Sequence, residues 1–307
     1  MEYHIPVMLA ESLKFLQVKA CRKYIDATLG DGGHTIGILK LGGEVLGIDV
    51  NEGSLDRARK RIDAENLGGH FVWARGNFKD IDRIAKDKGF DQVNGVLFDL
   101  GVSTTQVKDE RMGLSFNSEY EPDMRLDDKL GVKAFDLING LYEKELADMF
   151  WEFGEERYAK KFAKEIVRAR ELERISSAKQ LADIARKAFP GYENGRLHPA
   201  TRLFMALRIA VNNELENLKS ALPRAGGLLL PGGRLIVISF QSLEDKIVKE
   251  FAQVPQPKDD YRHGGEIRRD DVVMTEVVRK PLKPIPEEVA QNPGARSAKM
   301  RVFERYD

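Results

Sequence analysis

Residues 26–34 read Asp-Ala-Thr-Leu-Gly-Asp-Gly-Gly-His and follow a short strand-like run at 22–25. An acidic residue, Asp49, closes the next apolar run and lies 19 positions after Gly30. Glycines let backbone amides approach a ligand, and a carboxylate about 20 residues further along accepts hydrogen bonds from ribose hydroxyls. The strand, glycine turn and carboxylate therefore predict a pocket for an adenosine-containing cofactor. The alternative for Asp49 is an ordinary surface aspartate.

The glycine turn also bears on which cofactor this is. Gly30 and Gly32 fill the first two places of the dinucleotide pattern G-x-G-x-x-G, but the third place falls on Thr35. Asp31 would also put a negative charge beside an incoming pyrophosphate. S-adenosylmethionine has no phosphate and carries a positive sulfonium, which tolerates nearby carboxylates. We therefore expect S-adenosylmethionine, with a nicotinamide dinucleotide as the more distant alternative.

Length and composition set the outer limits. The chain has 307 residues, which exceeds the roughly 100–200 of a single domain, so we expect one full core plus a second domain or a large insertion. Lysine plus arginine number 49, as do aspartate plus glutamate, so no net charge draws the whole protein to nucleic acid or to a membrane. Any basic surface must be local.

Several absences predict a cytoplasmic protein without membrane contact. Cys21 is the single cysteine and cannot form an intrachain disulfide, and the N-terminus lacks the basic and apolar regions of a signal peptide. The longest apolar stretch, 228–240, is interrupted by Pro-Gly-Gly-Arg and falls short of the ~20 residues of a spanning helix. The five histidines lack ligand-like spacing, so we expect no metal site.

The order of elements predicts a parallel α/β sheet with a helical insertion. We expect strands at 23–28, 44–49, 70–74 and 93–98, separated by segments with helical spacing. From Val107 a polar loop runs to 132, and three helices follow with no strand between them. We expect these helices at 133–152, 155–171 and 177–189. The third is expected to have Ser176 or Ser177 as its N-cap and to stop before Pro190, and a further helix is expected near His198-Pro199.

Strand-like sequence resumes after the turn Pro231-Gly-Gly233, at 234–240, as expected for the fifth strand of a Rossmann-like methyltransferase. Two later runs, 272–279 and 298–304, predict a hairpin at the edge of the sheet. The prolines between those runs predict a structured loop rather than a helix.

Asp99 follows the fourth strand at the edge where open α/β sheets bind ligands, which suits a catalytic or methionine-binding carboxylate. Methylation of a base amine needs an acceptor aimed at its N–H groups, because the nitrogen lone pair is delocalised into the ring. The usual Asp/Asn-Pro-Pro-aromatic signature is absent here, so the substrate cannot be read from this motif. Phe78 could flank an adenine or pack in the core, and His34 could lie by the cofactor or only in the first turn of a helix.

Two further motifs stay ambiguous at this stage. Asp123 and Arg125 could order a substrate base or phosphate, or could form a salt-bridged loop anchor. The helix at 155–171 carries cations three or four residues apart, which suits either a track for phosphates or a solvated helix face. These cations are Arg157, Lys160, Lys161, Lys164 and Arg168.

Taken together, the motifs resemble one family closely, the MraW/RsmH-type methyltransferases of small-subunit ribosomal RNA, over nearly the whole chain. The matching stretches include His4-Ile-Pro-Val-Met, Asp31-Gly-Gly-His34, Asp99-Leu-Gly-Val-Ser103 with Gln106, Asp123-Met-Arg125, Tyr158-Ala-Lys-Lys-Phe-Ala163, His198-Pro-Ala-Thr-Arg202, Ala206-Leu-Arg-Ile-Ala-Val-Asn212, Ser239-Phe240, Ser242-Leu-Glu-Asp-Lys246, Asn292-Pro293 and Ala295-Arg-Ser297.

The resemblance implies an α/β fold, namely a Rossmann-like S-adenosylmethionine-dependent methyltransferase core with an inserted all-helical domain. It also implies N4-methylation of a cytidine in the decoding centre (P-site region) of 16S rRNA, within the 30S ribosomal subunit. The core would span 1–106 and 214–307, and the helical substrate-recognition domain would span 107–213.

Carried over by position, the family pattern implies a set of site residues. The cofactor contacts would be Gly32, Gly33, His34, Asp49, Phe78, Asp99 and Gln106. Asp99 and Asp123 are the expected catalytic residues near the reactive amine, and Arg125 and Arg202 are the expected substrate-binding residues.

This chain departs from the family pattern at four places, none of them among the expected cofactor contacts. Met112, Glu121, Gln241 and Gly294 stand where the family usually has Arg, Pro, His and Arg. These departures concern the RNA side, so two alternatives stay open: a methyltransferase that acts on another substrate, and a ribosome-assembly factor that binds the cofactor without catalysis.

Overall fold

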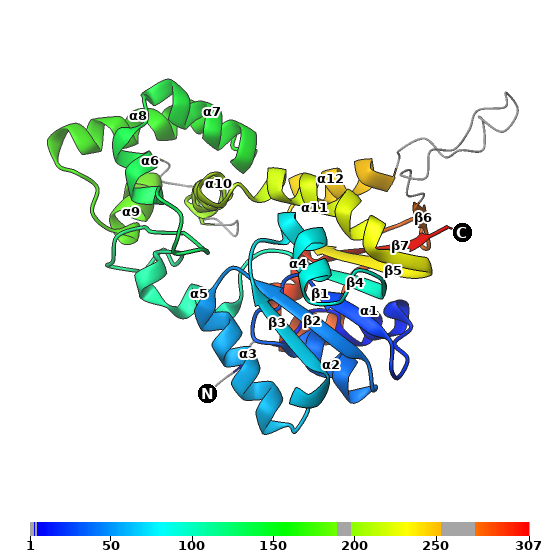
Figure 1. The fold of residues 1–307 in the computed structure, drawn as a ribbon. Helices are drawn as coiled ribbons and strands as arrows, with labels where there is room; N and C mark the ends of the chain where they lie inside the picture. The colour runs from blue at the N-terminus through cyan, green and yellow to red at the C-terminus, as the bar shows by residue number, and fades with distance from the viewer. Residues whose placement is uncertain (1–2, 4, 189–197, 253–273, 307) are drawn as a thin grey trace, which may run out of the picture. The chain divides into compact units, whose positions relative to one another are not determined.

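A mixed sheet organises the first part of the fold, which we describe from a computed structural model covering residue 3 and residues 5–188, 198–252 and 274–306. Seven strands lie in the order β3-β2-β1-β4-β5-β7-β6 (Figure 1). Strands β1 to β5 are parallel, β7 is antiparallel to β5, and β6 is antiparallel to β7. The strands are β1 Lys23–Asp26, β2 Glu44–Asp49, β3 Phe71–Arg75, β4 Val93–Asp99, β5 Leu229–Ser239, β6 Met274–Glu276 and β7 Lys299–Arg305.

Helices connect these strands and build the rest of the chain. They are α1 Leu9–Leu16, α2 Gly33–Lys40, α3 Glu52–Ala64, α4 Ile81–Asp87, α5 Thr104–Lys108, α6 Ala134–Gly140, α7 Glu143–Gly154, α8 Ala159–Leu172, α9 Ala178–Ala188, α10 Thr201–Asn212, α11 Glu214–Leu228, α12 Ser242–Ala252 and α13 Pro286–Gln291. Of the described residues, none forms a helix that is long and apolar enough to cross a membrane.

The sheet is buried on both faces, as its apolar strands require. Along β5, Leu235 and Val237 join a core with α4, α11 and α12, whereas Ile236 and Ile238 join a second core with α1 and α2. Successive side chains of a strand point to opposite faces, so one apolar run serves both cores. The predicted α/β class, with its largely parallel sheet, is confirmed.

The described chain divides into two compact units, Met1–Gly101 with Leu215–Asp307, and Val102–Glu214. The first contains the sheet. The second is helical and has its own hydrophobic core, in which Phe150, Phe162 and Ile166 are fully buried. Each unit is therefore described by itself below.

Within the helical unit, the prediction of a single helix at 133–152 is wrong. This stretch forms two helices, because α6 ends at Gly140 and the backbone N–H of Tyr142 is then capped by Glu145 Oε2 at 2.8 Å. Helix α8 begins at Ala159 rather than at 155, after Glu155 adopts a left-handed backbone conformation. The expected cap of α9 is confirmed, since Ser177 Oγ accepts the N–H of Gln180 at 3.1 Å.

Three other expectations need correction. Strand β5 starts before the Pro-Gly-Gly turn, which is accommodated by a register shift opposite Val93 and Gly95. The segment between the last strands is not all loop, because α13 begins at Pro286, where a missing N–H costs little. The expected start of α10 near Pro199 is two residues early. The antiparallel pairing of β6 with β7 is confirmed, although Val272, like Pro190, lies outside the described residues.

Candidate functional site

The glycine turn lies at the carboxyl ends of the central strands. Strand β1 pairs with β2 on one side and with β4 on the other, because the chain runs from β1 through β2 to β3 and then crosses back to β4. Such a switch point is where open α/β sheets bind ligands. The turn after β1 and the carboxylates that end β2 and β4 therefore share one edge of the sheet, as predicted.

Asp49 holds the turn in shape. Its Oδ2 accepts the backbone N–H of Gly30 at 2.8 Å, and its Oδ1 accepts that of Asn51 at 2.8 Å. Gly30 and Gly32 have φ angles of 52° and 76°, a region that glycine occupies without strain. Burial raises the pKa of Asp49, and the two N–H bonds offset part of that rise. A carboxylate has about four acceptor positions, so Asp49 retains capacity for further donors.

The negative charge of Asp31 does not stand where the sequence argument placed it. Its carboxylate is buried and accepts a hydrogen bond from Arg57 Nε on α3 at 2.8 Å, while Arg61 donates to its backbone carbonyl at 3.2 Å. The pair neutralises the charge that we expected to repel a pyrophosphate. The argument from Asp31 against a dinucleotide is therefore weaker than expected, whereas the missing third glycine stands.

His34 is oriented by the segment that precedes α1. Its Nε2 lies 2.9 Å from the carbonyl oxygen of Val7, and since a carbonyl only accepts, Nε2 carries the proton. Pro6 lies so close that a Cβ on Gly33 would be 3.0 Å from its ring. The far end of the chain holds this segment in turn: Glu288 accepts the N–H of Met8 at 2.6 Å, and Asn292 donates to the carbonyl of Ile5 at 3.2 Å.

Asp99 is the most unusual group at this edge. Its Oδ2 lies 3.7 Å from Nδ1 of His34, and its Oδ1 is buried without a hydrogen-bond partner among the described residues. Burial first, and then the carboxylates of Asp26, Glu244 and Glu288, raise its pKa well above the usual value. An acceptor oxygen left unpaired in a buried position indicates a place for a donor or cation from outside the chain.

A further carboxylate, Asp26, ends β1. Asp26 accepts the hydroxyl of Thr35 at 2.8 Å and the N–H of Thr28 at 3.3 Å, while the hydroxyl oxygen of Thr28 accepts the N–H of Asp99 at 2.6 Å. Burial raises the pKa of Asp26 to about 6, although the hydrogen bonds from Thr35 and Thr28 lower it. These contacts tie the ends of β1 and β4 together.

Phe78 follows β3 and packs edge-on against Phe98 of β4, with ring centroids 5.6 Å apart. It is only partly buried, so the packing interpretation is supported while a role beside an adenine stays a prediction. Gln106 belongs to the helical unit, where it exchanges hydrogen bonds with Ser103 at 2.8 and 3.2 Å and so caps α5.

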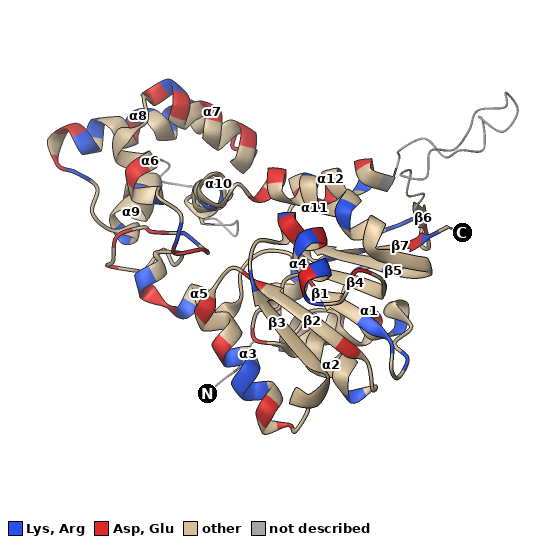
Figure 2. Ribbon diagram, in the orientation of Figure 1, with Lys and Arg blue, Asp and Glu red and all other residues tan. Residues whose placement is uncertain are grey.

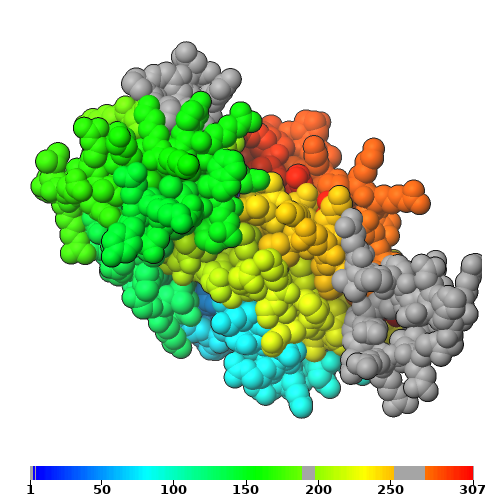
Figure 3. All heavy atoms as spheres, turned by 90° about the horizontal axis from the view of Figure 1, so that it is seen from above, coloured from blue at the N-terminus to red at the C-terminus, as the bar shows by residue number. Residues whose placement is uncertain are grey.

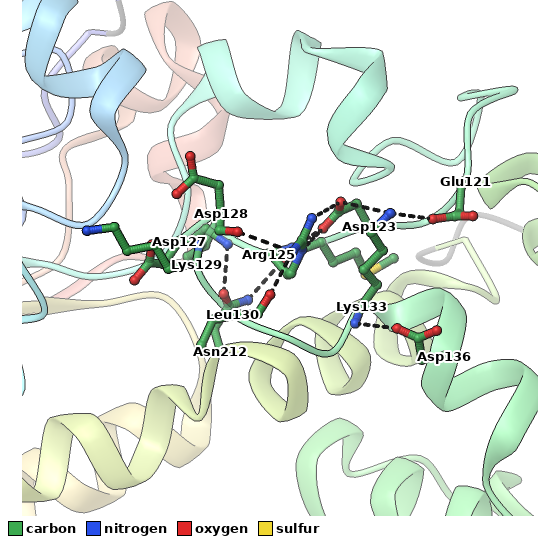
Figure 4. A network of polar contacts seen from close by, with 12 residues as sticks. Glu121, Asp123, Arg125, Asp127, Asp128, Lys129, Leu130, Lys133, Asp136 and Asn212 are labelled. Carbon is green, nitrogen blue, oxygen red and sulfur yellow. Dashed lines mark hydrogen bonds and ion pairs between the residues drawn. The ribbon is translucent and has the colours of Figure 1, made fainter.

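Within the helical unit, Asp123 and Arg125 contact each other. Arg125 donates from Nε and Nη2 to the two carboxylate oxygens at 2.6 and 2.8 Å, and from Nη1 to the carbonyl of Leu130 at 2.6 Å (Figure 4). Burial raises the pKa of Asp123, but the hydrogen bonds from Arg125 outweigh it and leave that pKa below its usual value. This fork supports the loop-anchor interpretation, and contact with substrate stays a prediction for both residues.

Asn212 of α10 fixes the same loop. Its Oδ1 accepts the N–H of Leu126, and its Nδ2 donates to the carbonyl of Met124, each at 2.8 Å. Met124 is fully buried and has a φ of 60°, a strained value for a residue other than glycine. Arg202 donates to the carbonyl of Glu155 at 2.8 Å and stays partly exposed.

Sequence reasoning missed the residues that act on this edge from a distance. Residues 4–8 and 242–246 match the family pattern, but no role was assigned to them or to Arg57, and only the contacts of Arg57, Glu244 and residues 5–8 reveal what they do. The described residues contain no group of three or more His, Cys, Asp or Glu side chains that could hold a metal ion.

A parallel sheet in this order, extended by an antiparallel β7 and carrying a glycine turn and a carboxylate at its ligand-binding edge, defines the fold of the Rossmann-like methyltransferases that use S-adenosylmethionine. Within that class the chain can be placed further. Residues 1–306 match the MraW methylase family, and the chain belongs to that family.

Its relatives are similar over almost their whole length. A protein of Deinococcus radiodurans named ribosomal RNA small subunit methyltransferase H is 42% identical over 302 residues, which cover 98% of this chain and 89% of that protein. A protein of the same name from Carboxydothermus hydrogenoformans is 41% identical over 309 residues, which cover 98% of this chain and 97% of that one.

Proposed function

We propose that this protein transfers a methyl group from S-adenosylmethionine to the N4 amine of a cytidine in the decoding centre of 16S rRNA, on the small ribosomal subunit. The names of its relatives support a ribosomal RNA of the small subunit as substrate. The observation that carries the chemistry is Asp99, a partly buried carboxyl whose Oδ1 is buried and has no hydrogen-bond partner among the described residues, at the switch point of the sheet. We expect the protein in the cytoplasm, where small subunits are assembled.

The residues present fit the cofactor. S-adenosylmethionine, when bound, supplies an electrophilic methyl group on a positively charged sulfur. Asp49 is oriented in advance by two backbone N–H groups and keeps acceptor positions for ribose hydroxyls. The other contacts expected from the family pattern are Gly32, Gly33, His34, Phe78, Asp99 and Gln106.

Asp99 suits a cationic ligand for an electrostatic reason. Burial, and then neighbouring carboxylates, disfavour its ionised form and hold its pKa well above the usual value. A positive charge beside Asp99 would cancel that repulsion and leave it ionised. Oδ1 would then gain the partner that it lacks.

The exocyclic amine of cytosine becomes nucleophilic when its lone pair leaves conjugation with the ring. An acceptor for its N–H groups favours that change and takes the proton that the amine loses. Asp99 and Asp123 are the proposed acceptors. Because the pKa of Asp123 is below its usual value, Asp123 suits a hydrogen-bond acceptor better than a proton acceptor. Arg125 and Arg202 are the proposed substrate-binding residues.

The test is to incubate the purified protein with radiolabelled S-adenosylmethionine and small subunits that lack the modification, then to identify the labelled nucleoside by mass spectrometry. We expect N4-methylated cytidine, and loss of transfer in Asp49→Ala and Asp99→Ala. A labelled product other than this would refute the stated substrate. Tight association with the subunit and intact cofactor binding, without any product, would instead support a non-catalytic assembly factor.

A further inference from the structure

One face of α8 carries a group of exposed cations. They are Lys160, Lys161, Lys164 and Arg168, and Arg157 lies in the turn just before the helix; we call these five residues the basic face of α8. Residues three or four apart share a helix face, so these side chains lie together, and blue segments recur along α8 in Figure 2. The opposite face is buried in the helical unit through Phe162 and Ile166. Figure 3 shows the outer surface of the green segment that contains α8, and the five cations are exposed.

This arrangement weakens the helix that carries it. The first turn of α8 contains no acidic residue but has two lysines, whose charge opposes the positive end of the helix dipole. Lys164 also stands four residues from Lys160 and from Arg168, and like charges at that spacing are destabilising by about 0.2–0.5 kcal/mol per pair. Stability of the helix alone therefore does not account for this pattern, whereas binding of a polyanion does.

On other exposed helices some cations pair locally, whereas single lysines such as Lys60 and Lys86 make no ion pair with a described residue. Arg59 of α3 lies 3.5 Å from Asp56, and Arg186 of α9 lies 2.9 Å from Asp183. On the basic face, Arg168 lies 3.4 Å from Glu165. Lys160 and Lys164 make no ion pair with any residue in the described part of the chain. Lys160, Lys161, Lys164 and Arg168 are therefore four exposed cations on one helix, and Lys160 and Lys164 add positive charge that no ion pair with a described residue offsets.

We propose that the basic face of α8 binds the phosphate backbone of ribosomal RNA in the small subunit, an inference that rests on the proposed function. From Lys160 to Arg168 the helix rises about 12 Å. Taking duplex DNA as a guide, one strand carries a phosphate about every 3.4 Å, so three or four phosphates fall within that reach. Tyr158 precedes α8, is about half exposed, and offers a ring on which an unstacked base can lie.

The experiment is charge reversal on this face in the full chain, as Lys160→Glu, Lys164→Glu and Arg168→Glu together. The matched control reverses three exposed cations on the methyltransferase core, Lys60→Glu, Lys86→Glu and Lys249→Glu. Binding to purified small subunits is measured over a range of salt concentrations, along with KM for the subunit, Kd for S-adenosylmethionine and Tm.

Loss of three phosphate contacts should make the slope of log K against log salt shallower by about 2, taking ~0.7 for each contact to a single strand. At 0.1 M salt this corresponds to an affinity loss on the order of 100-fold, with a parallel rise in KM. Kd for S-adenosylmethionine should not change. Tm should change little, because Lys160→Glu places an acid at the helix N-terminus while Arg168→Glu removes the exposed ion pair with Glu165.

An unchanged affinity and salt slope, or an equal loss in the core control, would overturn the proposal. So would a variant that keeps its affinity for the subunit but loses binding to an acidic protein or to anionic vesicles. Failure of the proposed function looks different, since it would leave the wild-type protein without methylated product, whereas subunit binding is measured without methyl transfer.

Discussion

Replacement of Arg57 by methionine should destabilise the protein by about 2–4 kcal/mol at pH 7. Arg57 Nε lies 2.8 Å from a carboxylate of Asp31 whose side chain is only 1% exposed. Removing one partner of a buried pair costs about 3–5 kcal/mol. Arg57 is itself 26% exposed, so solvent screens part of this energy. The stranded carboxyl can also take up a proton, which for an ordinary aspartate costs about 4 kcal/mol at pH 7 and limits the total.

The assay is a double-mutant cycle of wild type, Arg57→Met, Asp31→Asn and the double variant, each unfolded in urea at pH 7 and pH 5. Arg57→Met should be destabilised less at pH 5 than at pH 7, because Asp31 in the folded variant takes up a proton more readily than it does in the unfolded chain. The Kd for S-adenosylmethionine should also rise, since Asp31 precedes Gly32, which packs against Ala58 of α3. A coupling energy below about 0.5 kcal/mol, as between independent sites, would refute this reasoning.

Three further results follow from the same structure. Burial raises the pKa of Asp26 to about 6, so the free energy of unfolding should fall by up to about 3 kcal/mol as pH rises from below 4 to above 6. Urea unfolding of Asp26→Asn should show a flatter dependence of that free energy on pH in this range, and an unchanged slope would contradict the assignment. Burial and neighbouring carboxylates raise the pKa of Asp99, so binding of S-adenosylmethionine should release a proton and become tighter as pH rises. Titration calorimetry in buffers of different ionisation enthalpy should detect the released proton, and Asp99→Asn should abolish the release. Gly113→Ala should lower the free energy of unfolding in urea by about 3 kcal/mol or more, since a Cβ there would lie 2.5 Å from Cα of Pro122 and φ is 63°. The control is Gly140→Ala, whose Cβ would meet nothing within 4 Å and which should leave that free energy nearly unchanged.

Local patterns in the chain predicted the parallel strands and the place of Asp49. A strand, a glycine turn and a carboxylate at fixed spacing are all read within about 25 residues, so no long-range information was needed. The same holds for Ser177, whose cap follows from one hydroxyl beside the start of a helical pattern.

Contacts between segments that are far apart in the sequence could not be predicted from local patterns. No sequence pattern pairs Asp31 with Arg57, or Ile5 with Asn292, because those contacts depend on how helices lie on the sheet. The boundary between α6 and α7 was not predicted, for another reason. The apolar spacing continues through Leu141, and the capping contact of Tyr142 with Glu145, more than that spacing, marks the boundary.

The division of the sheet between two distant stretches of chain has a consequence for synthesis on the ribosome. Strand β4 ends at Asp99, but its neighbour β5 begins only at Leu229, 130 positions later. At about 5–20 residues per second, the nascent chain exposes an apolar strand edge for roughly 7–26 s before its neighbour emerges. Asn292, which ties down the first residues, is made later still. A nascent chain should therefore need chaperone protection in that interval, and it should acquire its fully braced ligand-binding edge only near the end of translation.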